Sequence, residues 1–533
     1  MEKNKVSKLL LWLLVFVLVL AGALLAVIKF NLLGFNSSTK TVKDEKVALD
    51  NISIGTIKAP KNIYPMCANE GSEIAFNSAI FETLATFNRD NIIVPVLATK
   101  WDNPDNKTWR FYLSSEAKFS NGDPVTADDV KFTFDTIRAD ETSQMSTVLP
   151  TAEVKVIDSG TVEFITQNPD PVLLNKLAGS FFVMSKKDIE ENGFNNKNIG
   201  SGPYIVSEFA DGYTKMTVND SYWGDKPKVK NVTYKSIESG KEVDALINGD
   251  IDLIFYLTPE NKADIRLTEA IQNNKVYLAE TTSDNVNYFD IDSLRDKTPY
   301  INLDSNPLKD KRVREAITLS LDMDDFITDV PDTVIANQMV TRGVFGYNPS
   351  ITKTHRDVTK AKELMKEAGY ENGFTLTVDI IESSTAVDLI NRFSSYLTGI
   401  NVKLVPNSLS QDDFFGKVVS KDTSAFFVGF STTSKDASEV LEGMIHTPSD
   451  VYGQYNLGYS NATLDKMIEE ASITLNQQTR QQELQEAMKI AMEDYAKIPL
   501  FSYSFESAVS SKIYWQPRVD ALLIATELAG KVQ

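Results

Sequence analysis

The feature that most constrains the fold of this chain is an uncharged run of twenty residues near its N-terminus, residues 9–28. As a helix rising about 1.5 Å per residue, this run is roughly 30 Å long, which matches the hydrocarbon core of a membrane. Lys3, Lys5 and Lys8 precede it, and basic flanks stay on the cytoplasmic side. We therefore predict a short cytoplasmic end (1–8) and a transmembrane anchor (9–28). The chain would be a single-pass protein of the cell membrane, with its N-terminus inside and most of its residues outside the cytoplasm.

A cleaved signal peptide is the alternative for the same run, because Ala21-Gly22-Ala23 offers small residues for cleavage. The run is longer than the usual apolar core of a signal peptide, about 7–15 residues, and this favours an uncleaved anchor. No cysteine follows the run until Cys67, which excludes a lipidated N-terminus. The polar, aperiodic stretch that ends at residue 46 is typical of a flexible tether over 29–46.

Beyond the tether, short strand-like runs alternate with amphipathic helices, and no internal repeat is evident. Alternating apolar residues predict strands at 109–113, 229–237 and 374–381. Helical periodicity predicts helices at 242–247, 310–321, 359–368, 462–473 and 480–495. Thr126 and Asp129 have the spacing of a capping box, which predicts a helix start there. This alternation predicts a mixed α/β fold with more than one lobe.

Composition excludes several function classes. The 54 Lys and Arg against 73 Asp and Glu leave a net charge of −19, which argues against nucleic-acid binding. The single Cys and the two His, His355 and His446, are too few and too far apart for a His- or Cys-based metal centre. Ser115 and Lys118 have the spacing of a Ser-x-x-Lys hydrolase motif, but they follow a strand and lack the accompanying motifs. A serine hydrolase is therefore only a remote alternative, and we predict a non-enzyme without catalytic residues, metal or cofactor.

A series of weak motifs points to a known family. The motifs, in chain order, are KFSNGDPVTADDV (118–130), GSGPY (200–204), NDSYWGDKP (219–227), GDID (249–252), PLKDKRVREAI (307–317), AKELMKEAGY (361–370), YSNATLD (459–465) and IPL (498–500). In this order the chain resembles the oligopeptide/dipeptide solute-binding proteins (family 5) of ABC importers over roughly residues 50–515. The resemblance is specific for the family and says nothing of the ligand.

This resemblance implies a bilobal α/β fold of the periplasmic-binding-protein type (type II) with an extra inserted subdomain. The crossover segments would be 281–292 and 500–505. The expected domains are a first lobe at 47–283 that carries the insert at about 66–195, a second lobe at 284–502, and a return to the first lobe at 503–533. A solute, with a peptide as the expected class, would be captured by lobe closure and delivered to ABC permease subunits. A binding module of the same fold, acting as a peptide sensor or chaperone without import, is the alternative.

The resemblance also implies where the ligand lies. The residues it assigns to the ligand are Asn69, Glu70 and Gly71 in the first-lobe loop, Phe255 and Tyr256 after the GDID motif, Tyr288 on a crossover segment, and Phe430, Ser431, Thr432 and Thr433 in the second lobe. Tyr64 stands where the family pattern has an Asp.

The second-lobe segment departs from the family pattern Trp-x-x-Asp, whose Asp holds the α-ammonium group of a peptide. Phe430 and Thr433 occupy these two positions, and a neutral hydroxyl cannot supply the charge-assisted bond of a carboxylate. Asp436 could substitute for it, or could correspond to a separate acidic position of the family. Oligosaccharides and metal chelates therefore remain alternative solutes.

Other conspicuous residues are assigned to structure. We expect Tyr222 and Trp223 to pack inside a lobe, and His446 to be a packing or surface residue. The Gly200-Ser-Gly202 stretch lacks the strand–turn–helix context of a phosphate loop. Asp129, Asp252 and Arg314 are expected to cap or bridge elements rather than to contact ligand.

Overall fold

The computed structural model describes residues 46–66, 71–140, 143, 145–149, 152–195 and 199–531. The predicted cytoplasmic end, anchor and most of the tether, together with Asn69 and Glu70, lie outside the described residues. Among the helices that are described, none has the length and apolar character needed to cross a membrane. Lys46–Lys531 forms one compact unit.

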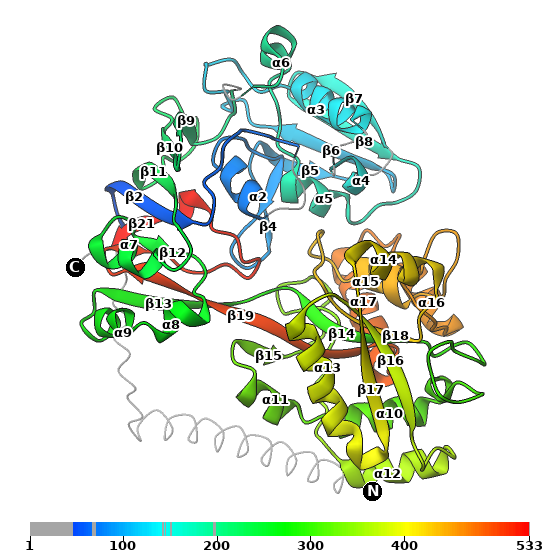
Figure 1. Ribbon diagram of the computed structural model, residues 1–533. Helices are drawn as coiled ribbons and strands as arrows, with labels where there is room; N and C mark the ends of the chain where they lie inside the picture. Colours follow the sequence, from blue (N-terminus) through cyan, green and yellow to red (C-terminus); the bar gives the residue numbers. More distant parts are fainter. Residues whose placement is uncertain are drawn as a thin grey trace, which may run out of the picture. The chain divides into compact units, whose positions relative to one another are not determined.

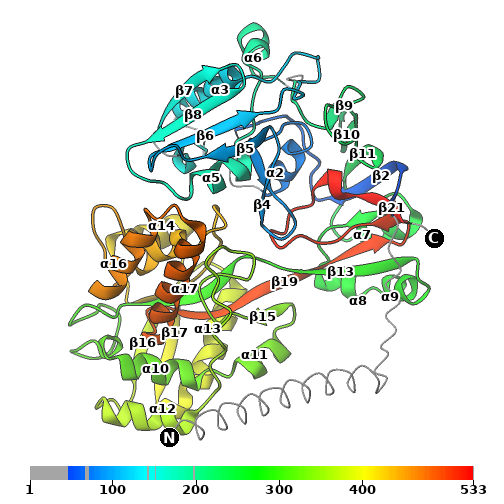
Figure 2. The ribbon, with the colours of Figure 1, turned by 180° about the vertical axis from the view of Figure 1, so that it is seen from behind.

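One long strand, β19 (Ile498–Ser510), belongs to two groups of strands, as both ribbon views show (Figures 1 and 2). Its C-terminal half pairs antiparallel with β13 (Val276–Thr282), and its N-terminal half with β14 (Val286–Ile291). Only residues 283–285 separate β13 from β14. The chain thus passes between the two groups at two neighbouring places, within the segments 281–292 and 500–505 that the sequence analysis expects to cross.

The first group of strands forms a sheet around the C-terminal half of β19. Its strands, in order from β19, are β12 (Leu253–Ile254), β2 (Leu49–Thr56), β11 (Val229–Ser236), β10 (Tyr213–Val218) and β9 (Tyr204–Ala210). The helices around it are α2 (Gly71–Asn77), α7 (Glu242–Asn248), α8 (Pro259–Ala263) and α9 (Ile265–Gln272). Phe76 of α2 meets Tyr234 of β11 edge-on at 5.7 Å, while α7 and α9 pack in a separate core with β12 and β13. Both faces are therefore buried, as expected for the parallel pairs β2–β11 and β2–β12.

The second group of strands surrounds the N-terminal half of β19. It contains β14, β15 (Thr333–Ile335), β16 (Phe374–Ile381), β17 (Val402–Leu409) and β18 (Ala425–Phe430). One core is formed with α10 (Lys311–Ser320), α11 (Met323–Asp329), α12 (Val358–Glu367) and α13 (Ser384–Tyr396). The other core is formed with α14 (Gln411–Ser420), α15 (Ser438–Val440), the π-helix η3 (Leu441–Ile445), α16 (Ala462–Ala471) and α17 (Gln477–Glu493). This sheet is also buried on both faces.

A third, four-stranded antiparallel sheet has its own aromatic core. Its strands, in order, are β5 (Ala98–Asp102), β6 (Thr108–Leu113), β8 (Thr161–Thr166) and β7 (Ala152–Asp158). Its helices are α3 (Ala127–Ala139), α4 (Met145–Val148), α5 (Leu173–Ser180) and α6 (Lys186–Asn192). Phe164 meets Phe111, Phe134 and Phe181 at ring distances of 5.5–6.2 Å. This sheet lies between α2 and β9 in the chain, within the predicted insert.

Short elements complete the described chain. They are the pair β3 (Ala85–Phe87) and β4 (Ile93–Pro95), the small sheet β1 (Lys46–Val47), β21 (Ala529–Lys531) and β20 (Ile513–Tyr514), and the 3₁₀-helices η1 (Pro307–Lys309), η2 (Leu397–Ile400) and η4 (Ala525–Glu527).

The predicted helix and strand positions agree closely with the observed ones, because local signals end these elements. Asp129 accepts hydrogen bonds from the Thr126 backbone N–H at 2.9 Å and its hydroxyl at 2.6 Å, which completes the predicted capping box of α3. Helix α7 ends at Gly249, which has a left-handed φ of +78°. The helix predicted at 480–495 starts earlier, at Gln477, because Asn476 caps it through the Thr479 N–H.

The residues assigned to structure do pack or bridge. Tyr222 and Trp223 donate to the buried Glu82 carboxylate at 2.6 and 2.9 Å, and burial raises the pKa of Glu82. The Arg314 guanidinium donates to main-chain carbonyls, including that of Asp494 at 2.7 Å. A Cβ atom at Gly200 would lie 1.9 Å from the Ile80 carbonyl oxygen, so the glycine stretch serves close packing rather than phosphate binding.

Candidate functional site

The second-lobe segment predicted to bind the solute leaves the sheet at the end of β18. It contains residues 430–439, from Phe430 to the start of α15. Its main chain is held by hydrogen bonds to other parts of the chain: Asn175 of α5 donates to the Ser434 carbonyl, the Phe345 N–H donates to the Lys435 carbonyl, and the Ala437 N–H donates to the Phe345 carbonyl, each at 2.9 Å. The segment is therefore fixed both by its own lobe and by a helix of the inserted sheet.

Glu439 supplies a carboxylate beside Thr433. The Thr433 hydroxyl lies 3.2 and 3.3 Å from the two carboxylate oxygens, and Ser434 donates to the same carboxylate from its N–H at 3.1 Å and its hydroxyl at 2.8 Å. No Lys, Arg or His of the described chain forms an ion pair with Glu439 within 4.0 Å. The segment thus carries an uncompensated negative charge six residues after the position where the family pattern has its Asp.

Sequence reasoning missed Glu439. A carboxylate that bonds residues five and six positions earlier across a bent loop has neither helical nor strand spacing, so no periodic pattern reveals it. The only signal in the sequence is its place in the first turn of α15, where acidic residues are common for a different reason, the helix dipole.

Asp436 does not face a solute. Its carboxylate accepts two hydrogen bonds from the Arg480 guanidinium, at 2.6 and 2.9 Å, and one from the Ser438 N–H at 3.0 Å. The side chains of Asp436 and Arg480 are 1% and 0% exposed. Asp436 is therefore a buried structural residue, which favours the interpretation that it corresponds to a separate acidic position.

Two further contacts join the segment to the crossing. The Lys435 ammonium pairs with Asp284, which lies in the short link between β13 and β14. Phe430 pairs with Val286 at the start of β14. Thr432 is buried, and its hydroxyl has no hydrogen-bond partner in the described structure. A movement of residues 283–285, the link between β13 and β14, would therefore displace this segment directly.

The predicted first-lobe residues lie on the other group of strands. Phe255 meets Phe505 of β19 at 5.4 Å and Trp515 at 6.0 Å. Tyr256, 60% exposed, has its ring 5.9 Å from that of Phe505. Gly71 is the first residue of α2, where a Cβ atom would lie 3.1 Å from the Leu522 side chain. Tyr503, half-exposed on β19 next to this aromatic group, is a further candidate that the sequence analysis did not select.

Tyr288 is buried, in contrast to the role predicted for it. Its side chain is 1% exposed, its ring meets Phe426 edge-on at 6.2 Å, and its hydroxyl lies 3.8 Å from the Met444 sulfur. Burial raises the pKa of its hydroxyl. Tyr288 thus packs in the second-lobe core and offers no surface to a solute in this structure.

Within the described chain, the two sets of predicted residues are connected through paired strands. Phe430 pairs with β14, β14 pairs with β19, and β19 carries Phe505, on which Phe255 and Tyr256 pack. The structure therefore brings each set together locally, and relates one to the other through the two crossing segments.

A half-buried carboxylate adds to the charge near this segment. Burial raises the pKa of Glu442, on η3, to about 7. The neighbouring cations Arg480 and Lys176 act to lower this pKa, and the carboxylates of Asp436 and Asp170 act to raise it. Lys176 and Asp170 pair with each other at 2.9 Å. Glu442 thus changes charge near neutral pH, at a place where the second lobe approaches the inserted sheet.

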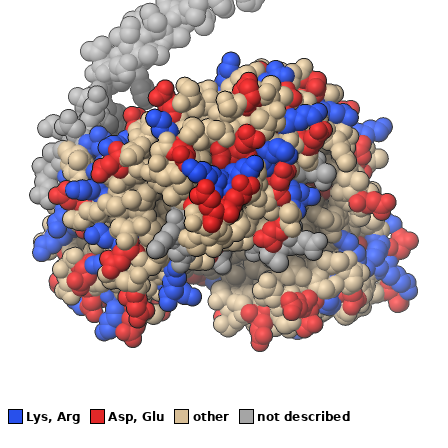
Figure 3. Space-filling view, turned by 90° about the horizontal axis from the view of Figure 1, so that it is seen from above, with Lys and Arg blue, Asp and Glu red and all other residues tan. Residues whose placement is uncertain are grey.

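The described residues form no metal-binding cluster, and charges of both signs are mixed on the face that Figure 3 shows. Within the part of the chain that the structure describes, no group of three or more His, Cys, Asp or Glu is positioned to hold a metal ion. His446 stacks on Tyr452 at 4.4 Å, and its Nδ1 lies 2.7 Å from the Thr447 carbonyl. Acidic and basic side chains are interspersed on the face in Figure 3, unlike the continuous basic surface that nucleic-acid binding requires.

Comparison with known proteins agrees with this architecture. The sequence pattern of the family described as "Bacterial extracellular solute-binding proteins, family 5 Middle" matches residues 93–450, roughly two thirds of the chain. The chain is 26% identical, over 488 residues, to the probable D,D-dipeptide-binding periplasmic protein DdpA of Escherichia coli. That alignment covers 88% of this chain and 91% of the relative.

Two solved structures share the fold. HbpA2 from Haemophilus parasuis superposes with a TM-score of 0.79 at 20% identity, covering 91% of this chain and all of that one. The unliganded open form of MppA, a periplasmic murein tripeptide-binding protein, also superposes with a TM-score of 0.79, at 19% identity, covering 92% of this chain and 99% of that one.

Proposed function

This chain belongs to the bacterial extracellular solute-binding proteins of family 5, and we propose that it captures peptides and delivers them to an ABC-type permease. It is a binding protein rather than an enzyme, as the members of the family are. The peptide class is supported by its relative DdpA, which is named for binding D,D-dipeptides.

The observation that carries the mechanism is the sharing of β19 by two sheets, beside the short link between β13 and β14. Two sheets whose main chain passes between them at two neighbouring places can change their relative angle by small rotations at these crossings. A solute that contacts both sheets stabilises the closed arrangement, because these contacts exist only there. We propose that the lobes have the bounds 47–283, 284–502 and 503–533, with the insert at about 66–195.

We propose that the segment 430–439 reads the amino end of the peptide. Main-chain groups after β18 suit a peptide of any sequence, since a strand-like ligand offers its own donors and acceptors. Glu439 supplies the acceptor for an α-ammonium group, since its charge has no cationic partner within the described chain. Thr433 and Ser434 hold the carboxylate in place. The proposed ligand residues therefore include Phe430, Ser431, Thr432 and Thr433.

The first-lobe contacts in this proposal are Asn69, Glu70, Gly71, Phe255 and Tyr256. Exposed Tyr256 offers an apolar face for varied peptide side chains. Residues 9–28 are proposed to anchor the chain in the membrane with the binding lobes outside, which would raise the effective concentration of the receptor at its permease.

The experiment compares peptides with free and acetylated amino ends, by calorimetric titration and by thermal unfolding of the full-length chain in detergent. At a free ligand concentration 100 times Kd, binding to the folded state alone adds about 2.7 kcal/mol of stability. Glu439→Gln should weaken binding of free-amino peptides by about 10- to 100-fold, since a charge-assisted bond contributes about 1.5–3 kcal/mol. Binding of the acetylated peptides should change little.

Thr433→Ser is the matched control, because it keeps the hydroxyl that faces Glu439. Equal effects of Glu439→Gln on free and acetylated peptides would contradict the role of Glu439. Absence of any stabilisation by a broad peptide library would contradict the peptide class itself.

The membrane anchor is tested separately. Deletion of residues 1–46 should release the protein from the membrane fraction, and continued sedimentation with membranes would contradict that proposal.

A further inference from the structure

Lysines face one another across the small sheet of β1, β21 and β20. Lys46 of β1 lies directly opposite Lys531 of β21. On the other side of β21, the register with β20 places Lys512 opposite Lys531, and the Lys531 N–H donates to the Lys512 carbonyl at 2.8 Å. Residues directly opposite each other in antiparallel strands share a face. Three lysine side chains therefore leave one face of this sheet, whose strand β21 lies beside β2 in Figures 1 and 2.

A fourth lysine lies next to this sheet. The Ser511 N–H donates to the Lys275 carbonyl at 2.9 Å, which brings Lys275 beside the start of β20. Lys46, Lys275 and Lys512 are exposed, and Lys531 is partly exposed. We refer to these four residues as the lysine cluster. The stretches that carry them contain no Asp or Glu; they are 46–49, 273–278, 511–516 and 528–531.

Aromatic rings contact two ammonium groups of the lysine cluster. The Nζ atom of Lys46 lies 4.8 Å from the ring centre of Tyr514, and that of Lys531 lies 5.6 Å from the ring centre of Tyr277. Within the described chain, no carboxylate lies within 4.0 Å of the ammonium of Lys46, Lys275 or Lys512. A ring holds an ammonium group in place without neutralising it. The lysine cluster therefore keeps its positive charge.

This arrangement is unfavourable for the chain alone. Like charges directly opposite each other on paired strands are destabilising. Carboxylates are abundant, with 73 Asp and Glu against 54 Lys and Arg. Lysines elsewhere on the surface use them: Lys131 pairs with Asp135 at 2.8 Å, and Lys187 pairs with Asp123 at 3.1 Å. A group of lysines that lacks such pairs in an acidic protein suits an anion from outside the chain.

The place of the lysine cluster in the chain favours one kind of anion. Residues 29–45 connect the proposed anchor to Lys46, which is itself part of the cluster. At about 3.5 Å per residue, this connection cannot exceed roughly 60 Å, and a flexible chain of the same length spans about 21–25 Å on average. An anchored chain thus keeps the cluster within reach of lipid headgroups. Basic residues near a membrane segment are attracted to anionic lipids.

We propose that the lysine cluster binds the anionic headgroups of the membrane in which the chain is anchored. The inference goes beyond peptide capture, and it takes from the proposed anchor only the nearness of the membrane. Tyr277 and Tyr514 suit the same surface, since tyrosine is enriched where a membrane meets water. The first lobe is thereby held against the bilayer. The second lobe contributes no residue to the cluster and remains able to move at the crossings.

The experiment measures how close the cluster comes to a bilayer. Full-length protein carries a fluorophore at Ala48→Cys, an exposed position beside β1, in a Cys67→Ser background. It is reconstituted into vesicles of phosphatidylcholine, alone or with about 30% phosphatidylglycerol, that contain lipids with a quenching headgroup. Phosphatidylglycerol should increase the quenching, and about 0.5 M salt should abolish the increase by screening. The same label at Ser395→Cys, on α13 of the second lobe, should not respond.

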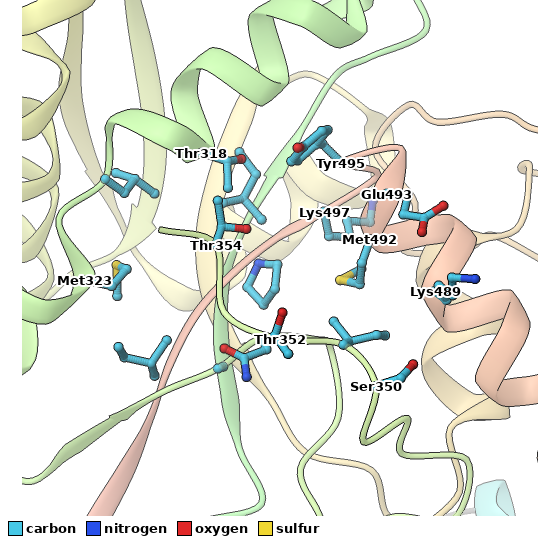
Figure 4. A pocket seen from close by; sticks show the side chains of 17 residues that line it. Thr318, Met323, Ser350, Thr352, Thr354, Lys489, Met492, Glu493, Tyr495 and Lys497 are labelled. Carbon is cyan, nitrogen blue, oxygen red and sulfur yellow. The ribbon is translucent and has the colours of Figure 1, made fainter. Parts of the chain in front are cut away.

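The lysines are tested by neutral substitutions. Lys46→Gln and Lys512→Gln should each lower the ratio of quenched to unquenched label about fivefold in anionic vesicles. The Tm of the double variant should not fall, because opposed like charges are removed. The matched control is the double variant Lys353→Gln, Lys489→Gln, which removes the same charge from the second lobe. Lys489 lies on α17 at a pocket of that lobe, as Figure 4 shows.

Two acidic residues next to the cluster give a test of opposite sign. Asp44 and Glu45 directly precede Lys46 in the sequence. Their charges oppose docking on anionic lipid, so Asp44→Asn with Glu45→Gln should increase the quenching at Ala48→Cys. A decrease would contradict the proposal. So would equal quenching with and without phosphatidylglycerol, or equal losses in the two double lysine variants.

Flotation of the vesicles separates this proposal from that of the anchor. Protein that floats at high salt but shows no lipid-dependent quenching at Ala48→Cys keeps the anchor and overturns the role of the cluster. Protein that floats only with anionic vesicles at low salt supports the cluster without the anchor, and protein that floats with neither vesicle overturns both. Loss of quenching on addition of glycerol 1-phosphate, at constant ionic strength, would assign the cluster to a soluble anion and overturn the membrane role.

Discussion

At the scale of single residues, the second lobe depends on charges that are buried in pairs. Asp436 with Arg480, and Asp290 with Lys497, have almost no exposed side-chain surface. Burial lowers the pKa of Lys497 and raises that of Asp290, while their mutual attraction opposes both shifts. A buried pair contributes little net stability, but removing one partner leaves the other charge desolvated and alone.

Arg480→Leu should therefore lower the free energy of unfolding by about 3–5 kcal/mol, measured by denaturant unfolding. Lys489→Leu, on the same helix, is the matched control, because its pair with Glu486 is half-exposed and should contribute less than about 1 kcal/mol. The double variant Asp436→Leu, Arg480→Leu should lose less stability than Arg480→Leu alone. A larger loss in the double variant would contradict this account of the pair.

The raised pKa of Glu442 makes stability depend on pH. Its pKa is about 7 in the folded protein, against a reference of 4.5, so the folded state binds more protons than the unfolded state between these values. Stability from this group is therefore present at low pH and falls as the pH rises from about 4.5 to about 7. Glu442→Gln should reduce the fall in Tm between pH 5 and pH 8, measured by calorimetry. An unchanged Tm profile would show that Glu442 titrates in its ordinary range.

At the scale of elements, glycines mark the places where backbones meet. Gly200 lies so close to Ile80 that a Cβ atom would overlap its carbonyl oxygen. At Gly416, inside α14, a Cβ atom would point into open space, with no neighbouring atom within 4 Å. The same residue type thus serves packing in one place and carries only an entropic cost in the other.

Gly200→Ala should destabilise the protein by more than about 1 kcal/mol, because the backbone must shift to accommodate the methyl group. Gly416→Ala should instead stabilise it by about 0.5–1 kcal/mol, since alanine favours a helix interior. Both values come from denaturant unfolding of purified variants. Stabilisation by Gly200→Ala would refute the close approach described for this motif.

At the scale of the whole molecule, an ion-pair bridge joins the two groups of strands next to the crossing. Lys262 of α8 pairs with Asp332, which precedes β15, at 2.6 Å, and with Glu506 of β19 at 3.0 Å. The Ser504 N–H donates to the Asp332 carbonyl at 2.8 Å. Because α8 packs with the first sheet and β15 belongs to the second, this bridge opposes changes in their relative angle.

Lys262→Met should broaden the distances between spin labels at Ser239, in the turn between β11 and α7, and Ser395, on α13, both exposed, in a Cys67→Ser background. Lys241→Met is the matched control, since Lys241 pairs with Asp244 inside the first lobe at 3.8 Å. Electron-paramagnetic-resonance distance measurements on solute-free protein provide the comparison. Identical distributions for Lys262→Met and the unaltered chain would contradict a restraining role.

The sequence predicted most elements of the fold, since capping residues, glycine stops and apolar periodicity act within a few residues of each other. The strand at 374–381 and the helix that stops before Gly369 are examples of such local signals. The candidate site depends on packing between distant segments, which local signals do not show. Tyr288 was assigned to the solute from its place on a crossing segment, yet its ring lies in the core, because strand position alone does not reveal which face is covered.

By itself, the sequence determined a mixed α/β fold and, through its series of motifs, membership of family 5; the two crossings at 281–292 and 500–505 were what the resemblance implied. Only the tertiary structure decided which charges are paired and which are left over. Lys435 pairs with Asp284, 151 positions away, Asp436 pairs with Arg480, and Glu439 has no cationic partner within 4.0 Å in the described chain. The physical reason is range: propensities and caps are local, whereas the partner of a charge depends on how distant segments pack.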